Sequence, residues 1–435
     1  MEKPHSSIFK MCQINCGFFG VFFAWGLFFA NMSAVFTYVG AKDSQIALFW
    51  FAGPLAGMIV QPIIGVWSDW TWNKLGRRKP FMIFGSIIAC IGLFVMVYVN
   101  DLVLAVSIFT IMMFAINALQ GPYKALPADM FNSKQVSLGY IVQYIFVAAG
   151  SSIAYFTPEI LSNVFKLSNV SHGGDLPDVM RISFIIGAIV FAVSMAITCV
   201  FVKEYPPEDI KKFREEKKKQ GSLVIKSFSS FSILFKMPKV MQEVSLAMFF
   251  AWLGIFLVFV YFADAVAINI YKATPDTVLY TKGVEWAGFC FGMYSVFSLV
   301  FSLIMPSINK VISQKTLFAI TMLCGGISMI CMLFVSSPGM LIVIMVGVGI
   351  MFAGNQSLPY AIIGESVDKE SMGLNMGIFN ISLCVPQLMI SLFFGFALKY
   401  ILGGNCIYAL VVGGVFMLIS VVFAFKIHYV DPGKA

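Results

Sequence analysis

The chain has 435 residues, of which 59% are hydrophobic and 11% are charged, and its formal net charge is +8. Ordinary soluble domains are about 25% charged, so this chain lacks the polar surface that a soluble protein of its size needs. The composition therefore excludes a soluble enzyme, a secreted disulfide scaffold and a disordered chain, and it indicates a protein with many membrane-spanning helices.

A helix needs about 20 apolar residues to cross the hydrocarbon core of a bilayer. The chain contains twelve apolar stretches of this kind, in the order 9–37, 45–67, 81–99, 102–123, 138–160, 181–202, 243–267, 284–305, 316–336, 340–362, 374–398 and 405–427. The longest polar stretch, from Lys203 to Lys239, divides them into two sets of six. We therefore expect an all-α membrane protein with an N-terminal six-helix bundle at 1–202, a cytoplasmic linker at 203–239 and a C-terminal six-helix bundle at 240–435.

The distribution of Lys and Arg predicts the orientation. If the N-terminus is cytoplasmic, all but six of the 29 basic residues also face the cytoplasm; the exceptions are Lys42, Lys166, Arg181, Lys272, Lys282 and Lys399. Basic loop residues are retained on the cytoplasmic side of a membrane. We therefore expect both termini in the cytoplasm and an integral protein of the bacterial inner (plasma) membrane, embedded in the lipid bilayer. The positive net charge then follows from the topology and indicates no nucleic-acid partner.

The chain shows none of the patterns that carry enzymatic or cofactor chemistry. It has no nucleotide-binding glycine loop, no metal-ligand spacing and no nucleophile triad, and its three histidines lie outside the expected spans. The nine cysteines lie mostly within apolar stretches and are odd in number, which favours buried thiols over disulfides. We therefore expect no enzyme, no cofactor and no metal, and a chain that acts as a monomer.

A repeated dipeptide supports the division into two sets of six. Pro122-Tyr123 ends the fourth span, and Pro359-Tyr360 ends the tenth, 237 residues later. Asp129 and Glu365 follow these pairs closely. Two half-repeats that face each other across a central cavity are a recurring arrangement in transporters. The repeat therefore indicates a solute pathway between two related bundles.

The loop between the second and third spans carries the most specific motif. It reads Gly65-Val66-Trp67-Ser68-Asp69 and then Gly76-Arg77-Arg78-Lys79-Pro80. A glycine at position 65 lets helices approach closely, and the basic cluster holds the loop at the anionic cytoplasmic face of the membrane. A generic positively charged loop is the alternative. We expect gating or structural roles for a set of residues at the cytoplasmic ends of the spans, namely Gly65, Asp69, Gly76, Arg77, Arg78, Asp129 and Glu365.

This loop resembles the signature of the major facilitator superfamily. The extended stretch 61–80, together with 121–129, 203–209 and 376–380, is similar to the sucrose-transporter and bacterial disaccharide-transporter branch, which is related to the glycoside–pentoside–hexuronide:cation symporters. The resemblance implies a twelve-helix fold of two pseudo-symmetric bundles that moves a sugar together with a proton by alternating access. It also implies that Asp129 and Glu365 pair with cytoplasmic basic residues and so latch the outward-open state.

Three positions depart from that family pattern. Met113 stands where the branch carries an Asp in the fourth span, Lys124 replaces an Arg, and Phe28 replaces a Gln in the first span. Met113 cannot take up a proton, so the usual coupling acid is missing. Two acids near the outer ends of the seventh and eighth spans, Asp264 and Glu285, are therefore candidates for proton coupling. The alternative is that both are interfacial caps that face water.

Eleven residues in the spans are candidates for solute binding. Amides and tyrosine hydroxyls bond sugar hydroxyls, and aromatic faces pack on the C–H faces of pyranose rings. For each amide a hydrogen bond between helices is the alternative, and Lys124 alternatively extends to the membrane surface. The candidates are Trp25, Asn31, Asn117, Gln120, Lys124, Gln143, Tyr261, Gln356, Tyr360, Asn380 and Gln387.

The expected function is a proton-coupled secondary transporter of a disaccharide-like sugar or glycoside. The missing acid leaves open a family member repurposed for a less polar solute, or an uncoupled facilitator. A non-transporting membrane sensor on the same fold is a further alternative, although the intact loop motif and the polar residues of the spans argue against it.

Overall fold

The computed structural model describes residues 3–41, 49–168, 176–207, 209–219, 237–274 and 277–429. Within these ranges every regular element is a helix, which confirms the expected all-α class. The chain forms two compact units. Unit 1 comprises Met1–Pro238 and Gly364–Ile381, and unit 2 comprises Lys239–Ile363 and Ser382–Ala435.

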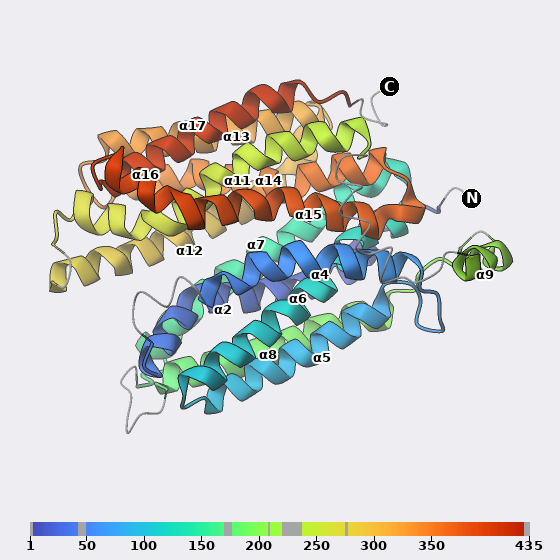
Figure 1. The fold of residues 1–435 in the computed structure, drawn as a ribbon, viewed down its shortest axis with the longest axis horizontal. Coiled ribbons are helices and arrows are strands. Elements are labelled where there is room, and N and C mark those ends of the chain that lie inside the picture. The colour runs from blue at the N-terminus through green and yellow to red at the C-terminus, as the bar shows by residue number, and fades with distance from the viewer. Residues whose placement is uncertain are drawn as a thin grey trace. The chain divides into compact units, whose positions relative to one another are not determined.

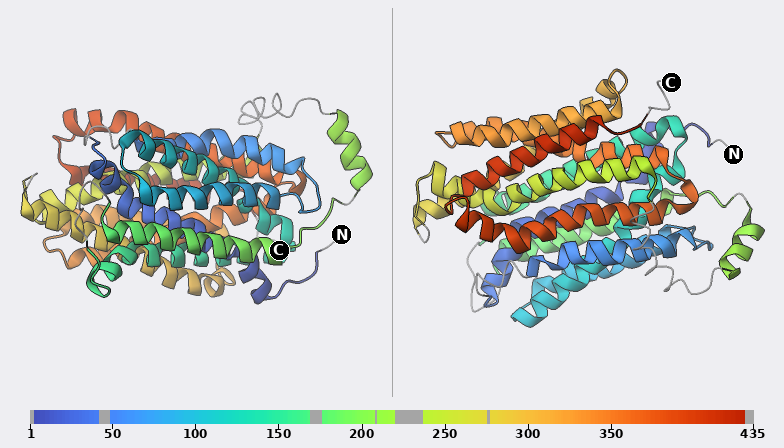
Figure 2. Two further views of the ribbon diagram at one scale, coloured as in Figure 1. Left: turned by 90° about the horizontal axis from the view of Figure 1, so that it is seen from below. Right: turned by 45° about the horizontal axis from the view of Figure 1, so that its top comes forward.

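Unit 1 is built from long helices that pack side by side (Figure 1). In it α2 packs along α7 and α8, α5 packs along α6 and α8, and α4 packs along α6. The short helix α9 lies beyond one end of these long helices (Figure 2). The elements are α1 (Ile8–Asn15), α2 (Gly17–Tyr38), α4 (Ala52–Asp69), α5 (Lys79–Val95), η1 (Met96–Tyr98), α6 (Leu102–Met130), η2 (Ser133–Gln135), α7 (Val136–Asn163), α8 (Asp178–Phe201), α9 (Ile210–Lys219) and η6 (Lys369–Ser371).

Unit 2 is also a bundle of long helices. In it α17 packs along both α11 and α13, and α12 packs against η4, a π-helix that continues α11. Two helices belong to both units, because α14 enters unit 1 at Gly364 and α15 enters unit 2 at Ser382. The elements are α11 (Lys239–Ala265), η4 (Val266–Ile270), α12 (Val278–Asn309), α13 (Gln314–Cys331), η5 (Met332–Phe334), α14 (Met340–Ser366), α15 (Met372–Met389), the π-helix η7 (Ile390–Phe394), α16 (Gly395–Tyr400) and α17 (Cys406–Phe425).

Short polar side chains fix the starts of several helices. The Asp101 carboxylate accepts a hydrogen bond from the Leu104 amide at 2.9 Å, just before α6. Thr277, Ser313 and Asn405 cap α12, α13 and α17 in the same way. These caps satisfy amides of the first turn that have no partner within the helix. The apolar stretches therefore become helices that begin at these polar residues.

The described residues contain ten helices that are long and apolar enough to cross a membrane, or eleven if α1 and α2 form one span bent by 41°. Each of the twelve stretches expected from the sequence contains a helix. One expected span, the helix α4, is not among these apolar helices. It has 18 residues, but Gln61, Pro62 and a polar end at Ser68-Asp69 lower its hydropathy. The multi-span helical class is thus confirmed, whereas twelve membrane crossings remain a prediction.

Side chains from two neighbouring helices stabilise the break between α1 and α2. The Thr198 hydroxyl accepts a hydrogen bond from the Gly17 amide at 2.8 Å, and the Tyr123 hydroxyl donates to the Ile14 carbonyl at 2.9 Å. Backbone groups at a helix break lose their partners, and hydrocarbon cannot replace them. Tyr123, from the first copy of the repeated dipeptide, therefore has a structural role at this break.

Candidate functional site

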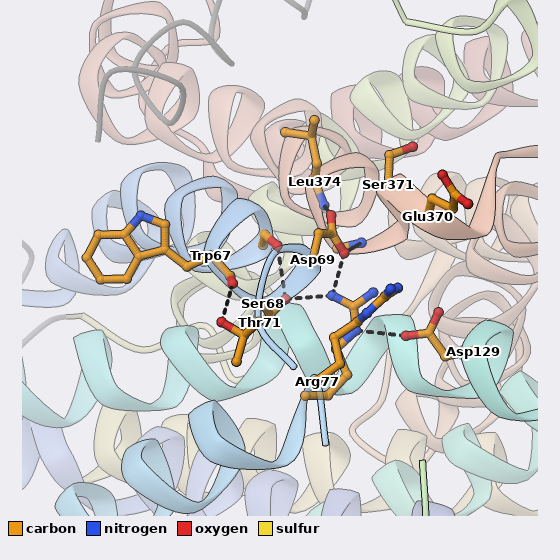
Figure 3. A network of polar contacts seen from close by, with 12 residues as sticks. Trp67, Ser68, Asp69, Thr71, Arg77, Asp129, Glu370, Ser371 and Leu374 are labelled. Atoms are coloured by element: carbon orange, nitrogen blue, oxygen red, sulfur yellow. Dashed lines mark hydrogen bonds and ion pairs between the residues drawn. The ribbon is translucent and has the colours of Figure 1, made fainter. Parts of the chain in front are cut away.

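The loop motif between α4 and α5 forms a charged network around Arg78, whose side chain is fully buried. Its Nη1 lies 2.6 Å from Asp69 Oδ1, and its Nε lies 2.7 Å from Asp129 Oδ2 (Figure 3). Nη1 also donates to the Ser68 hydroxyl at 2.6 Å. Burial disfavours the charge of the guanidinium, but the two carboxylates outweigh this effect and raise the pKa of Arg78. The network therefore keeps a permanent positive charge between acids of α4 and α6.

Asp69 also binds the first turn of α15. The Gly373 amide donates to Oδ1 at 3.0 Å, and the Leu374 amide donates to Oδ2 at 2.7 Å. Amides in the first turn of a helix lack intrahelical partners and carry partial positive charge, which favours a carboxylate at that place. Both Asp69 oxygens thus hold α15, and one of them also binds Arg78.

Two glycines permit this close approach. A Cβ atom on Gly65 would lie 2.3 Å from the Gly373 carbonyl oxygen. A Cβ atom on Gly373 would lie 2.4 Å from Arg78 Nη1 and 2.7 Å from Asp69 Oδ1. A side chain at either position would push α4 and α15 apart. The role expected for Gly65 therefore has a steric basis, and Gly373, for which the sequence indicates no role, shares it.

A second unassigned residue, Glu204, fills the bend of the motif loop. Its carboxylate accepts hydrogen bonds from the backbone amides of Arg77, Arg78 and Lys79 at 2.8–3.0 Å. Gly76 has a φ of +112°, and a Cβ atom there would lie 2.6 Å from Glu204 Oε1. Successive amides that converge in this way form an anion site. The available signal in the sequence was the position of Glu204 within the stretch 203–209.

A cleft of about 780 Å³ lies beside the network within unit 1. Lys3, at its wall, donates to the backbone carbonyls of Ala128 and Asp129 at the end of α6. Burial lowers the pKa of Lys3 to about 8, against the opposing effect of the Asp129 charge. The N-terminal segment is thus attached to the network through Lys3.

The linker helix α9 contributes another wall of this cleft. The ring of Phe213 stacks on Trp70 with 5.8 Å between the ring centroids, and the Arg77 guanidinium lies 6.0 Å from the Phe213 ring centroid. Arg77, expected at a gating position, therefore binds the linker, whereas the adjacent Arg78 binds the carboxylates.

Three of the solute-binding candidates come together between α4, α6 and α15. Asn117 Oδ1 accepts a hydrogen bond from Gln61 Nε2 at 2.8 Å, and Asn380 Nδ2 donates to the Gly57 carbonyl at 3.1 Å. Lys124 Nζ lies 3.4 Å from Asn380 Oδ1. These bonds join neighbouring helices, which is the alternative to solute binding that the sequence left open for each amide.

The other candidates of unit 1 have different surroundings. Gln143 Nε2 donates to Asn15 Oδ1 at 3.2 Å, and Asn31 Nδ2 donates to a carbonyl one turn earlier in its own helix. Gln120 is buried on α6, and Trp25 is partly buried on α2. Gln143 thus bonds another helix, and Asn31 bonds its own.

Two of the positions that depart from the family pattern lie in an apolar environment. Phe28 and Met113 are fully buried. Phe28 packs edge-on against Trp25 with 6.2 Å between the ring centroids. Gly53 lies close to both Trp25 and Met113. A Cβ atom on Gly53 would lie 3.6 Å from the Trp25 indole and 3.7 Å from the Met113 sulfur. Apolar groups therefore surround Trp25 where the family pattern has an amide and an acid.

The remaining acids of the expected set lie on three different helices. The Asp264 carboxylate, near the end of α11, accepts a hydrogen bond from the Tyr280 hydroxyl of α12 at 2.5 Å. Glu285 is exposed near the start of α12. Glu365, at the end of α14, accepts a hydrogen bond from the Ser137 amide at 3.0 Å and so binds the start of α7.

Unit 2 holds four further solute-binding candidates. Tyr261 of α11 lies against Phe394 with 5.6 Å between the ring centroids. On α14, Gln356 is partly buried and Tyr360 is buried. Gln387 Nε2 donates to a carbonyl one turn earlier in α15. These residues come from three helices, and Gln356 and Tyr360 share one helical face.

The sequence is similar to plant sucrose transport proteins along most of its length. It is 22% identical to sucrose transport protein SUT3 of Oryza sativa subsp. indica, over 89% of this chain and 86% of that protein. It is 25% identical to SUT5 of the same plant, over 86% of this chain and 79% of that protein. It is 24% identical to SUC4 of Arabidopsis thaliana, over 90% of this chain and 85% of that protein.

The fold is similar to those of solved transporters. The proton:xylose symporter XylE matches with a TM-score of 0.70 at 13% identity, over 98% of this chain and 97% of that chain. The E. coli fucose:proton symporter FucP matches with a TM-score of 0.68 at 15% identity, over 96% of this chain and 98% of that chain. A family model, the Major Facilitator Superfamily, matches residues 14–391. The chain therefore belongs to the major facilitator superfamily and is a membrane transporter distantly related to the plant sucrose transporters.

Proposed function

We propose that this protein moves a sugar-like solute of disaccharide size across the membrane by alternating access. The observation that carries the proposal is the similarity to sucrose transport proteins, which extends over 86–90% of the chain. Amide and aromatic side chains in the long helices of both units support it, because sugars bind such groups.

The charged network supports alternating access as the mechanism. Asp69 holds the first turn of α15, and α15 continues from unit 1 into unit 2. Ionic contacts that form in one conformation and break in another are recurrent in conformational switches. In this proposal Asp69, Arg78 and Asp129 form a latch of the outward-open state, and the contact of Glu365 with α7 is its second part.

The proposed topology has twelve membrane crossings in a bacterial inner membrane, with both termini in the cytoplasm and the protein as a monomer. The twelfth crossing is α4, the expected span that is less apolar than the others. Its polar residues Gln61 and Asp69 are buried and bonded to other helices, so they do not meet lipid. The excess of Lys and Arg in the expected cytoplasmic loops supports the orientation.

Proton coupling in this protein requires an acid other than the one in the family pattern, because Met113 stands at that position. The candidates for this acid are Asp264, which accepts a hydrogen bond from the Tyr280 hydroxyl, and Glu285. An uncoupled facilitator is the alternative, because the buried Met113 side chain has no titratable group.

Uptake into proteoliposomes tests both parts of the proposal. We expect saturable uptake of at least one radiolabelled disaccharide, faster when the outside is acidic and accompanied by alkalinisation of the outside. Uptake that neither responds to the pH gradient nor alkalinises the outside would contradict proton coupling alone. The absence of both uptake and exchange for every sugar would contradict sugar transport.

A second candidate is transport of a less hydroxylated solute. Phe28 and Met113, buried around Trp25, favour it because they replace an amide and an acid by apolar groups. A bound solute raises the melting temperature of the folded protein. Stabilisation by amphiphilic solutes and not by disaccharides would favour this candidate, and the opposite result would exclude it.

A further inference from the structure

Asn355, on α14 in unit 2, is a fully buried amide without a hydrogen-bond partner among the residues that the structure describes. Its side chain has an exposed fraction of 0%, and neither Oδ1 nor Nδ2 forms a hydrogen bond within the described part of the chain. An asparagine amide can donate two hydrogen bonds and accept two. Burying such a group without bonds is unfavourable, and buried polar groups in folded proteins are nearly always bonded. Asn355 therefore does not stabilise the fold through a hydrogen bond, and its presence in the buried face of α14 calls for another explanation.

The equivalent helix of the other half provides a direct comparison. Asn117 lies five residues before Pro122 in α6, and Asn355 lies four residues before Pro359 in α14. Both ends of the Asn117 amide are bonded. Its Nδ2 donates to a carbonyl one turn earlier at 2.8 Å, and its Oδ1 accepts from Gln61 Nε2 at 2.8 Å. The same residue type is thus satisfied in one half and unsatisfied in the other.

Aromatic rings lie beside the turn that carries Asn355. Phe352, one turn earlier on the same helical face, lies 5.5 Å from the Phe259 ring of α11 and 5.0 Å from the Tyr294 ring of α12, measured between centroids. Phe259 is only partly buried, and so is Gln356, the residue that follows Asn355. An unbonded amide near these rings, of which the Phe259 ring is partly exposed, suits a ligand that presents both hydroxyl groups and C–H faces.

We propose that Asn355 contacts the transported solute, and that a solute hydroxyl supplies its missing partner when transport opens this face of α14. The inference rests on the proposed sugar transport and adds a binding residue in unit 2. Such a residue also gives specificity, because a solute without the hydroxyl leaves the buried amide unpaired.

The same substitution at the two asparagines tests this inference. Leucine has the branching of asparagine but no polar atoms. For Asn355→Leu we expect a melting temperature equal to or above that of the wild type, because no protein bond is lost. We also expect the KM for sugar uptake to rise about tenfold, the effect of one lost hydrogen bond. For Asn117→Leu we expect a lower melting temperature, because Gln61 loses its partner.

Asn355→Ala repeats the measurement without added volume, in case leucine does not fit the site. An unchanged KM in both Asn355 variants would overturn the inference. Combined with a lowered melting temperature, that result would identify a buried water molecule as the partner of the amide. Failure of the proposed function is distinguishable, because it would abolish sugar uptake by the wild type before any substitution is made.

Discussion

Asp69 and Leu374 are separated by 305 residues in the sequence, yet the Asp69 carboxylate accepts a hydrogen bond from the Leu374 amide at 2.7 Å. The other oxygen of the same carboxylate lies 2.6 Å from the buried guanidinium of Arg78. One side chain therefore joins the end of α4, the start of α5 and the first turn of α15. The Asp69 carboxylate therefore holds the first turn of α15 and the buried Arg78 side chain at the same place.

Asp69→Asn removes the charge and keeps the size and an acceptor oxygen. Arg78 then keeps Asp129 as its carboxylate partner among the described residues, and losing a hydrogen bond between charged groups costs about 1.5–3 kcal/mol. We expect a clearly lower melting temperature in detergent. Asp101→Asn is the matched control, because Asp101 is an exposed cap of α6 and its change costs about 1 kcal/mol or less. Equal melting temperatures for the two variants would contradict the role of the network.

Gly373→Ala adds one methyl group to the same contact. The new Cβ atom would lie 2.4 Å from Arg78 Nη1 and 2.8 Å from the Gly65 backbone carbonyl oxygen. The buried Arg78 side chain or α15 itself must therefore shift, and the bonds of Asp69 are disturbed. We expect reduced thermal stability and reduced solute uptake. Gly339→Ala serves as the control, because a Cβ atom there has no heavy atom of the described residues within 4 Å. If the two variants behave alike, the close approach of α4 and α15 has no importance for stability or transport.

The residues of the charged network were singled out from the sequence, but their pairs were not, because Asp69 and Arg78 stand in one loop motif whereas Asp129 lies 51 residues after Arg78. Asp69, Arg78 and Asp129 were all expected at the ends of spans, and the structure joins them directly. The donors at Gly373 and Leu374 could not be predicted, because every residue except proline has a backbone amide and the sequence does not tell which amide lies nearby.

The solute-binding residues were less predictable for a related reason. An amide in an apolar helix faces either a cavity or another helix, and only its neighbours decide between the two. Gln61 on α4 pairs with Asn117, whereas Asn355 has no such neighbour among the described residues and was not singled out. The sequence indicates that an amide is present but not whether it is bonded.

Lys3 gives a prediction about pH. Burial lowers the pKa of Lys3 from 10.5 to about 8. Between these two values the unfolded chain binds more protons than the folded one, so the stability contributed at this site rises with pH across that window and stays constant below it. Competitive acetylation followed by mass spectrometry measures the titration. We expect a midpoint near pH 8 in the folded protein and near 10.5 after denaturation, and one common midpoint would show that Lys3 is not buried.

Asp264 provides the test of proton coupling. Asp264→Asn keeps an acceptor for the Tyr280 hydroxyl but cannot take up a proton. If Asp264 carries the coupled proton, uptake driven by a pH gradient falls to the level measured without a gradient. Exchange of labelled for unlabelled sugar persists, because exchange requires no net proton movement.

Glu285→Gln is the matched comparison, because Glu285 is an exposed acid near the start of the adjacent helix α12. Loss of driven uptake in this variant and not in Asp264→Asn would move the coupling site to Glu285. Unchanged driven uptake in both variants would remove both acids from the mechanism. Driven uptake that is absent from the wild type as well would make the protein an uncoupled facilitator, the alternative that the buried methionine at position 113 leaves open.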